Sequence, residues 1–313
     1  MKLFLWIFRQ TERDIINLYN SLTPYVRTAI NDSDNYMLNF GYWAKNSDDP
    51  VYAQHQLSAL FGKFAKFDTV RMIADVGSGF SAPAVQWRSE YPHLRIACID
   101  INYQELNVAR KAAIPPLLPP DRISLVNASS AMLPLGKEKI DMIVAFESAQ
   151  HFKSIDNFLS MSRFVLKPSG LLVLAIPVVD LHTLEKKEDE KENNMKKVRL
   201  MRKLGILYFS WASQHYDINT ISGSLIKNGY RIEEFQRIGH NVYEPLAEYY
   251  FRNRENIRCR LNQLLTSYKQ RMLFEIVEYM VFRSALKMKD LSIKGLLDYV
   301  LVRARKDDHM MDS

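Results

Sequence analysis

The chain has 313 residues, of which 47% are hydrophobic and 25% are charged. These proportions are typical of globular proteins and exclude a disordered chain, a collagen-like chain and a disulfide scaffold. The length corresponds to roughly two average domains. Lysine and arginine outnumber aspartate and glutamate by 42 to 35, and the net charge of +7 permits an anionic partner without requiring one.

The two cysteines, Cys98 and Cys259, lie far apart, outside any CxxC motif or Cys/His cluster. This spacing argues against a disulfide framework and a zinc site, and it favours a reducing, cytoplasmic setting. The apolar run at residues 3–8 (LFLWIF) is far shorter than the roughly 20 residues of a membrane-spanning helix. We expect it to pack against the domain, with a shallow contact to a membrane surface as the alternative.

Residues 11–67 carry apolar side chains at intervals of three and four, which predicts helices. From residue 71 onward, short apolar runs alternate with helix-compatible stretches, a pattern typical of a parallel sheet buried on both faces. We therefore expect an α/β doubly wound core. The predicted strands are 71–77, 94–100, 122–127, 141–146, 170–177, 230–238 and 296–306.

Two segments interrupt this core. Residues 185–192 (EKKEDEKE) are a run of mixed charge, typical of a solvated helix face or a loop. Between 246 and 290, apolar residues keep helical spacing over one long segment, which predicts core packing or a lid on the sheet. The expected organisation is a helical cap (1–68), an α/β domain (69–306) with insertions at about 181–216 and 246–293, and a polar tail (307–313).

Residues 72–84 (MIADVGSGFSAPA) are predicted to form a strand that ends near Asp75 and turns through Gly77 and Gly79 into a helix. Glycines let the main chain approach a ligand closely, and the helix N-terminus presents free N–H groups to an anion. A nucleotide triphosphatase is disfavoured, because FSA follows the last glycine where Lys and Ser or Thr are required. A dinucleotide-binding dehydrogenase stays open, with alanine at the third position of its fingerprint.

Asp100 ends the predicted strand 94–100 and lies 25 residues after Asp75. An acidic side chain at the tip of the second strand can accept hydrogen bonds from both hydroxyls of a ribose. The two acidic tips and the glycine turn therefore predict a nucleoside site. A solvated Asp100 that only starts a turn is the alternative.

The order of these motifs resembles the class I S-adenosylmethionine-dependent methyltransferases. DVGSG is similar to their first motif, CIDIN to their second, ASSAMLPL to their adenine-contacting loop, and FVLKPSGLLVLAIP to their fifth strand and the helix before it. The resemblance covers about residues 35–180 and returns at YVLVRARK near the end. It implies a Rossmann-like, mostly parallel seven-stranded sheet, and the NFGYW and FESAQHF segments look most like small-molecule methyltransferases.

Carried over residue by residue, the resemblance implies roles for five residues in binding S-adenosylmethionine. Asp75, Gly77 and Gly79 are expected to contact the methionine end. Asp100 is expected to hold the ribose, and Ile101 to pack against the adenine.

Two serines depart from the family pattern. Ser129 stands where the family commonly has an aspartate for the adenine amino group, and Ser81 replaces the usual third glycine. A serine hydroxyl still accepts a hydrogen bond, so Ser129 and Ser130 are expected in the adenine-contacting loop. The resemblance also places an aromatic over the cofactor pocket, for which Tyr42 and Tyr36 are candidates, with ordinary core packing as the alternative.

Methyl transfer needs little covalent help, because a sulfonium methyl is already activated and the enzyme mainly aligns the reactants. A base is required only for a hydroxyl or an acidic carbon. His151 follows the fourth strand at the carboxyl edge of the sheet and aligns with the general base of hydroxyl-methylating relatives, although a merely orienting role is the alternative. Glu147 is expected to line the methionine pocket, and Asp180 to orient His151 or a substrate hydroxyl.

Four observations narrow the class of acceptor and the type of reaction. FESA stands where amino-methylating nucleic-acid enzymes carry an Asn- or Asp-Pro-Pro-aromatic motif, and no aspartate-rich metal cluster follows strand four. The arginines at 252–260 are interleaved with acidic and apolar residues, as on a solvated helix face. Aromatic residues in the insertions, including Tyr208, Trp211 and Tyr249, favour an apolar acceptor.

The sequence therefore predicts a methyltransferase (EC 2.1.1.-) that uses S-adenosylmethionine, requires no metal, and acts on a hydroxyl or activated carbon of a small, apolar molecule. The alternative is a non-catalytic subunit of the same fold that docks a partner through its long C-terminal helix. A nicotinamide dehydrogenase is disfavoured by the motif order beyond strand two. The oligomeric state is left open.

Overall fold

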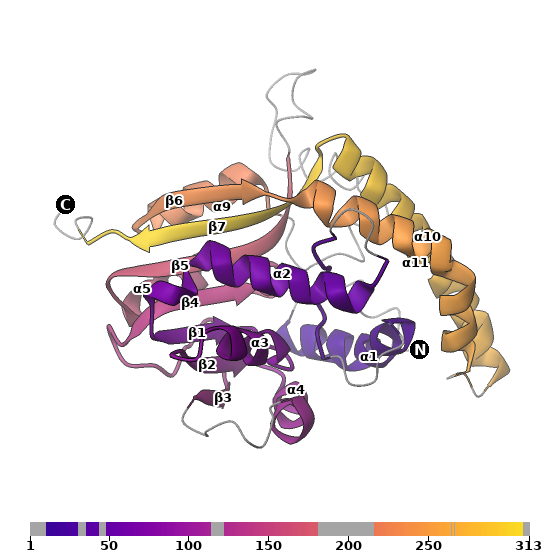
Figure 1. Ribbon diagram of the computed structural model, residues 1–313, viewed down its shortest axis with the longest axis horizontal. Helices are drawn as coiled ribbons and strands as arrows, with labels where there is room; N and C mark the ends of the chain where they lie inside the picture. The colour runs from indigo at the N-terminus through magenta and orange to yellow at the C-terminus, as the bar shows by residue number, and fades with distance from the viewer. Residues whose placement is uncertain are drawn as a thin grey trace.

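The computed structural model describes residues 11–30, 36–43, 48–113, 122–180, 216–263, 265 and 267–308. The apolar run at 3–8, the charged run at 185–192 and the aromatic residues Tyr208 and Trp211 lie outside the described residues. Figure 1 shows one sheet with helices on both faces and a helical pair that extends beyond its end.

The sheet has seven strands in the order β3-β2-β1-β4-β5-β7-β6. Strands β1 to β5 are parallel, and β7 runs antiparallel between β5 and β6. The strands are β1 (Met72–Val76), β2 (Arg95–Asp100), β3 (Ile123–Asn127), β4 (Ile140–Phe146), β5 (Leu166–Val179), β6 (Tyr230–Arg237) and β7 (Leu297–Lys306). The doubly wound, mostly parallel seven-stranded sheet expected from the sequence is confirmed.

The central strands are buried on both faces because their side chains alternate between two hydrophobic clusters. In β4, Met142 and Val144 belong to one cluster, and Ile143 and Ala145 belong to the other. Helices α2 (Pro50–Ala65) and α3 (Ala82–Glu90) cover the first face, and α5 (Ile155–Val165) and α9 (Ile218–Lys227) cover the second. Because both faces of these strands are buried, successive positions all carry apolar side chains, and this is why the sequence shows continuous apolar runs.

The segment predicted as helical at 11–67 folds as two helices, α1 (Glu12–Ile30) and α2, and residues 36–43 between them are not helical. Asp49 caps α2 by accepting a hydrogen bond from the Val51 N–H, and Pro50 occupies the first turn, where its missing N–H costs nothing. The remaining helical elements are short. They are α4 (Tyr103–Val108), which is followed by a π turn, and single 3₁₀ turns at Phe67–Thr69, Ala149–His151 and Gly239–Asn241.

The long segment predicted at 246–290 is two helices, α10 (Tyr243–Asn262) and α11 (Tyr268–Ile293), which pack together as the α10–α11 hairpin. The hairpin projects past the sheet, with α10 beside α1 (Figure 1). Ile257 is buried as expected, but the predicted packing on the sheet is wrong for Tyr268, Met272 and Ile276, which are 82%, 57% and 48% exposed. None of the helices in the described ranges is long and apolar enough to cross a membrane.

Candidate functional site

A cavity opens at the carboxyl ends of three neighbouring strands, β2, β1 and β4, with β1 in the middle. This is the point at which the strand order reverses, and open α/β sheets bind ligands there because the loops on the two sides diverge. The N-terminal helix α1 and residues 36–39 close the cavity from the outside, with Ile15, Ile16 and Tyr19 among the lining residues. The site therefore combines the sheet with a segment that precedes it in the chain.

The glycine turn forms part of the cavity wall, and both Gly77 and Gly79 line it. Gly77 has φ of +79°, and a Cβ at this position would lie 2.3 Å from the Cβ of Ser148. Ser148 is fixed in turn, because its hydroxyl donates a 2.5 Å hydrogen bond to the Val76 carbonyl. Position 77 thus requires glycine both for its backbone conformation and for the close approach of β1 to the loop after β4.

We expect Gly77→Ala to lower the free energy of unfolding by about 3 kcal/mol, because a positive φ and an overpacked contact each cost one to a few kcal/mol. Gly223→Ala is the matched control. Gly223 lies inside α9 with nothing within 4 Å of an added Cβ, so alanine there should stabilise the helix by about 1 kcal/mol. Urea denaturation of both variants measures the difference, and equal stability would contradict the steric role of Gly77.

Asp100 lies at the end of β2, lines the cavity and is only 8% exposed. Its two carboxylate oxygens accept hydrogen bonds from the Gly79 N–H, at 2.8 Å, and from the Asn102 N–H, at 2.7 Å. Burial raises the pKa of Asp100, and the backbone hydrogen bonds oppose this rise. The carboxylate therefore joins the glycine turn to β2 and presents acceptor oxygens to a ligand. Ile101, the next residue, also lines the cavity, and its packing against an adenine stays a prediction.

Glu105 was missed by the sequence analysis. It lies on α4, lines the cavity and is 6% exposed, and burial and the charge of Asp100 raise its pKa to about 8. Its Oε1 atom has no hydrogen-bond partner among the described residues. A buried, unpaired oxygen is costly unless a ligand satisfies it, so Glu105 indicates a donor group in the bound molecule. The sequence did contain a signal for Glu105, because an acidic residue five positions after Asp100 falls on the first turn of the helix that follows β2.

Asp75 does not line the cavity. Its side chain is 2% exposed beneath the glycine turn, and burial together with the nearby charge of Asp100 raises its pKa to about 8. Ser81, in the place of the third glycine, is also fully buried and has φ of +58°. Its hydroxyl lies 3.3 Å from the Ser78 hydroxyl and it adds no bulk to the cavity wall. The serine at this position thus leaves the binding space open.

Ser129 does not line the cavity either, although Ala128 and Ser130 beside it do. The Ser129 hydroxyl donates a 2.5 Å hydrogen bond to the carboxylate of Glu12 on α1, and Glu12 does line the cavity. A carboxylate from the N-terminal helix is therefore held next to the loop in which the family pattern has an aspartate.

Of the two tyrosine candidates, Tyr36 lines the cavity and Tyr42 does not. Tyr36 packs against Phe80, with ring centroids 5.7 Å apart. Tyr42 packs against the core cluster that contains Phe61, and its backbone N–H bonds to the Ala53 carbonyl. Of the two candidates, the structure thus brings Tyr36, and not Tyr42, to the cavity.

Glu147 follows β4, has φ of +54° and lines the cavity, as expected. Its Oε1 accepts hydrogen bonds from the Phe40 N–H, at 3.1 Å, and from the Tyr299 hydroxyl, at 2.8 Å. Burial raises its pKa to about 8, although both hydrogen bonds oppose the rise. Glu147 therefore ties residues 36–43 to the end of β4 and to β7.

The free energy of unfolding of the ligand-free protein should fall as pH rises from about 4.5 to about 8. In this range the folded protein keeps a proton on Glu147 that the unfolded chain, with an ordinary glutamate pKa of 4.5, has lost. Glu147→Gln keeps an acceptor oxygen and removes the titration, so its stability should depend less steeply on pH. Chemical denaturation at several pH values between 5 and 8 measures both slopes, and equal slopes would contradict the assignment.

His151 ends the 3₁₀ turn after β4 and lines the cavity, on the side of β1 opposite Asp100. Its Nε2 lies 2.8 Å from the hydroxyl of Tyr19 on α1, and the two rings meet edge to face with centroids 5.3 Å apart. A histidine at this place can accept a proton from a bound hydroxyl. Tyr19, which the sequence analysis did not single out, fixes the orientation of its ring.

Asp180 lies just past β5 but does not line the cavity. Its carboxylate is 3.7 Å from a guanidinium nitrogen of Arg237, which also approaches Asp298 at 3.6 Å. The structure thus brings His151 to the cavity without Asp180. Within the described residues, no group of three or more His, Cys, Asp or Glu side chains is arranged to hold a metal ion.

Comparison with known proteins agrees with this geometry. Residues 74–174 match a family model described as a methyltransferase domain, and the matched stretch contains Gly77, Asp100 and His151. The chain contains a class I S-adenosylmethionine-dependent methyltransferase domain. The strand order β3-β2-β1-β4-β5-β7-β6 is that of this fold.

Individual proteins also resemble the chain. Methyltransferase GfsG from Streptomyces halstedii is 26% identical over 175 residues, which are 55% of this chain and 61% of that protein. The chain is similar to the structure of the cyclase SpnF, at 17% identity and a TM-score of 0.63, covering 95% and 96% of the two chains. It is also similar to a sarcosine dimethylglycine methyltransferase, described as putative, from Galdieria sulphuraria, at 13% identity, a TM-score of 0.68 and coverage of 92% and 99%.

The two structural matches fall far below 25% identity, so they establish the fold of the methyltransferase domain alone. One of them is named a cyclase, which illustrates that this fold hosts more than one reaction. The matched part of GfsG spans less than two thirds of that protein. The reaction and acceptor of this chain therefore have to be argued from its own site.

Proposed function

We propose that the chain transfers a methyl group from S-adenosylmethionine to a hydroxyl or activated carbon of a small, apolar acceptor. The observation that carries the proposal is a single cavity with two chemically different sides. On the β2 side of β1 lie the carboxyl groups of Asp100 and Glu105, and on the β4 side lies His151.

The residues of the first side fit a nucleoside. Asp100 and Glu105 offer carboxyl oxygens to the two donor hydroxyls of a ribose, and Glu105 Oε1 is a buried oxygen without a partner in the described part of the chain. The open main chain at Gly77 and Gly79 leaves room for the methionine end. Glu12 takes the place of the missing family aspartate, because its carboxylate can accept a hydrogen bond from the adenine amino group while Ser129 holds it.

The bound S-adenosylmethionine would supply an activated sulfonium methyl, and the chain's own residues supply position and proton transfer. His151 accepts the proton that a hydroxyl acceptor loses as its oxygen gains the methyl group. Tyr19 holds Nε2 of His151 at 2.8 Å, so the imidazole stays directed into the cavity and is available to the acceptor once the tyrosine hydroxyl yields its place. The closing helix α1 keeps water out.

An apolar acceptor is supported by the wall around His151. Ile15, Ile16, Leu38 and Phe152 line the same cavity as His151, and α1, which supplies two of them, acts in our proposal as part of an N-terminal cap that ends at residue 68. Apolar walls favour acceptors that lose little hydration on binding. The Galdieria sulphuraria protein of the same fold is named for a small acceptor, which supports the size class alone.

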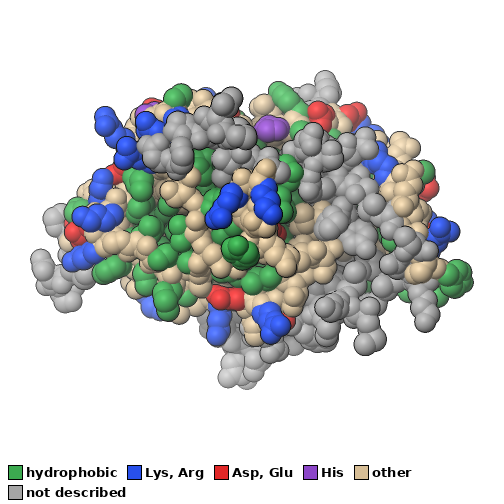
Figure 2. All heavy atoms as spheres, turned by 90° about the horizontal axis from the view of Figure 1, so that it is seen from below, with side chains coloured by type: hydrophobic (Ala, Val, Ile, Leu, Met, Phe, Trp, Pro, Cys, Tyr) green, Lys and Arg blue, Asp and Glu red, His purple; other side chains and the backbone are tan. Residues whose placement is uncertain are grey.

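Nucleic acid is not the expected acceptor. On the face shown in Figure 2, lysine and arginine side chains are scattered among hydrophobic ones and form no continuous basic surface in the described part.

Two free cysteines, one buried at Cys98 and one exposed at Cys259, support the cytoplasmic location that we propose. A contact of residues 3–8 with a membrane surface stays the alternative to packing against the domain, and unchanged liposome binding after deletion of residues 1–9 would contradict it.

Isothermal titration of the purified chain with S-adenosylmethionine and with its demethylated product tests the cofactor site. We expect saturable binding of both, followed by transfer of an isotope-labelled methyl group to at least one member of a panel of phenols, quinones, sterols and prenyl alcohols. Absence of binding would overturn the proposal. Binding without transfer to any acceptor would favour the non-catalytic subunit instead.

A further inference from the structure

We propose that the outward face of α11 is the interface of a symmetric dimer, in which α11 of one copy packs antiparallel against α11 of a second copy. This inference is independent of the proposed function, because it rests on the α10–α11 hairpin and not on the cavity. The hairpin extends past the sheet (Figure 1), so this face of α11 is accessible to a second molecule.

The face is unusually apolar for a surface. Among the described residues, seven large hydrophobic side chains of α11 are between 38% and 82% exposed, and all but Val281 form one stripe: Tyr268, Met272, Ile276, Tyr279, Leu286 and Ile293. At 3.6 residues per turn, all six positions fall within an arc of about 100°. Single exposed hydrophobics are ordinary, but a contiguous stripe along a helix of 26 residues marks an interaction surface.

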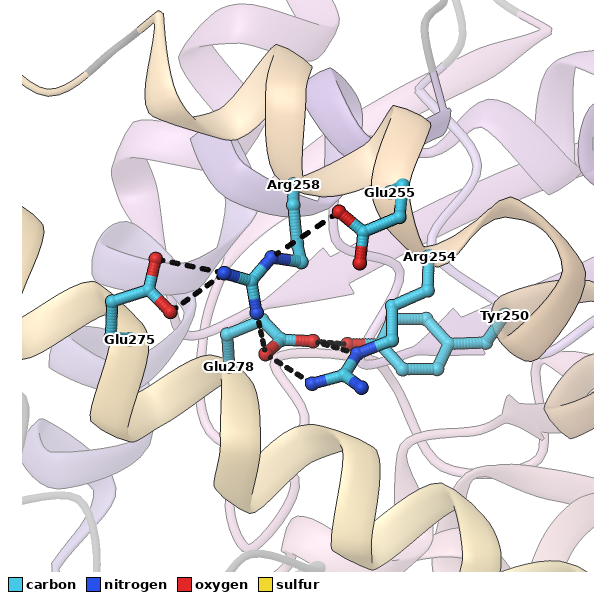
Figure 3. A network of polar contacts seen from close by, with 6 residues as sticks. All are labelled: Tyr250, Arg254, Glu255, Arg258, Glu275 and Glu278. Carbon is cyan, nitrogen blue, oxygen red and sulfur yellow. Dashed lines mark hydrogen bonds and ion pairs between the residues drawn. The ribbon is translucent and has the colours of Figure 1, made fainter.

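Helix α11 meets α10 through both apolar and charged side chains: Phe282 packs against Phe251, with ring centroids 5.6 Å apart, and Glu278 pairs with two arginines of α10. Figure 3 shows Glu278, which is 4% exposed, receiving hydrogen bonds from Arg254, Arg258 and Tyr250 of α10. Burial alone would raise the pKa of Glu278, but the hydrogen bonds from Arg254 and Tyr250 and the charges of Arg254 and Arg258 bring it below its usual value. These arginines, expected on a solvated face, instead lock the hairpin, so α11 presents its apolar stripe on a fixed support.

A second copy of the chain fits the stripe because the spacing of its residues is symmetric about Tyr279. Met272 and Leu286 each lie seven residues from Tyr279, and Glu275 and Arg283 each lie four residues from it. In an antiparallel pair centred on Tyr279, each Met272 meets the Leu286 of the other copy, and each Glu275 meets the Arg283. The two-fold axis thus creates two contacts between apolar side chains and two contacts between opposite charges.

A membrane surface fits the same face less well. Glu275 and Asp290 fall inside the apolar arc, and anionic lipid headgroups repel carboxylates. Glu275 is already held by Arg258 at 2.7 Å, and a carboxylate has acceptor sites for a second guanidinium. The carboxylates within the stripe therefore favour a protein partner that offers cations at matching positions. A second copy of this chain offers Arg283 opposite Glu275.

The mass of the full chain in solution, by sedimentation equilibrium, tests the dimer. We expect a dimer for the natural chain and a shift to monomer for Met272→Asp, which buries two charges in the pair. Val281→Asp is the matched control, since Val281 is 47% exposed on the opposite side of the same helix, and it should remain dimeric. A monomeric natural chain, or equal masses for the two variants, would overturn the proposal. Liposome binding lost only in Met272→Asp would assign the stripe to a membrane.

Disulfide trapping tests the register. In a Cys259→Ser background, which removes the exposed thiol, Met272→Cys and Leu286→Cys are prepared as separate proteins. We expect mild oxidation to cross-link a mixture of the two, and to leave each protein alone uncross-linked, because position 272 faces position 286 only in the antiparallel pair. Cross-links in either protein alone, or none in the mixture, would exclude this register.

Discussion

Asp100→Ala should weaken the binding of S-adenosylmethionine by about 100-fold or more. Hydrogen bonds to a charged group contribute about 1.5–3 kcal/mol each, and the variant loses those to the ribose as well as those that hold the glycine turn. In the structure the carboxylate accepts from the N–H groups of Gly79 and Asn102. Its removal therefore loosens both the ligand contact and the loop under the ligand. Isothermal titration measures the loss.

Asp100→Asn provides the matched control, because it keeps one acceptor oxygen and removes the charge. We expect it to bind with an affinity between those of the natural chain and the alanine variant, and to melt closer to the natural temperature. Unchanged affinity in Asp100→Ala, with the variant folded by circular dichroism, would show that the nucleoside lies elsewhere.

His151→Ala should lower the rate of methyl transfer to a hydroxyl acceptor by about 100- to 10,000-fold, the range over which a general base contributes. Cofactor affinity should change little, because His151 lies across β1 from Asp100. Single-turnover rates with labelled cofactor, together with titration of the variant, separate the two effects. A loss of affinity without a loss of rate would assign His151 to binding alone.

Tyr19→Phe distinguishes the base from its support. The phenylalanine keeps the edge-to-face contact and removes the hydroxyl that lies 2.8 Å from Nε2 of His151. We expect the rate to fall less than in His151→Ala and the pH profile of the rate to shift, because the imidazole loses the group that orients it. An unchanged pH profile would contradict a coupling between Tyr19 and His151.

The strands, the glycine turn and the acidic tip at Asp100 could be predicted from the sequence because each depends on a short-range pattern. A strand buried on both faces needs a continuous apolar run, and a main chain that turns with positive φ at Gly77 needs a residue without a side chain. These requirements act over a few residues, so they are visible in the sequence itself. The same reasoning placed Glu147 and His151 correctly at the end of β4.

Tertiary structure alone decided which side chains share the cavity. Glu12 and Tyr19 reach it from α1, more than 100 residues before Ser129 and His151, and no local pattern marks such a contact. The choice of Tyr36 over Tyr42 depends on how residues 36–43 cross the sheet end.

The same limit applies to the C-terminal hairpin and to Asp180. Helical spacing at 246–290 is the same whether an apolar stripe faces the core or solvent, so only the fold shows that the α11 stripe points outward. Asp180 is drawn towards Arg237, because the antiparallel β6 and β7 bring that cation beside the end of β5. Sequence determines local conformation and burial pattern, whereas contacts between distant segments depend on the complete packing of the chain.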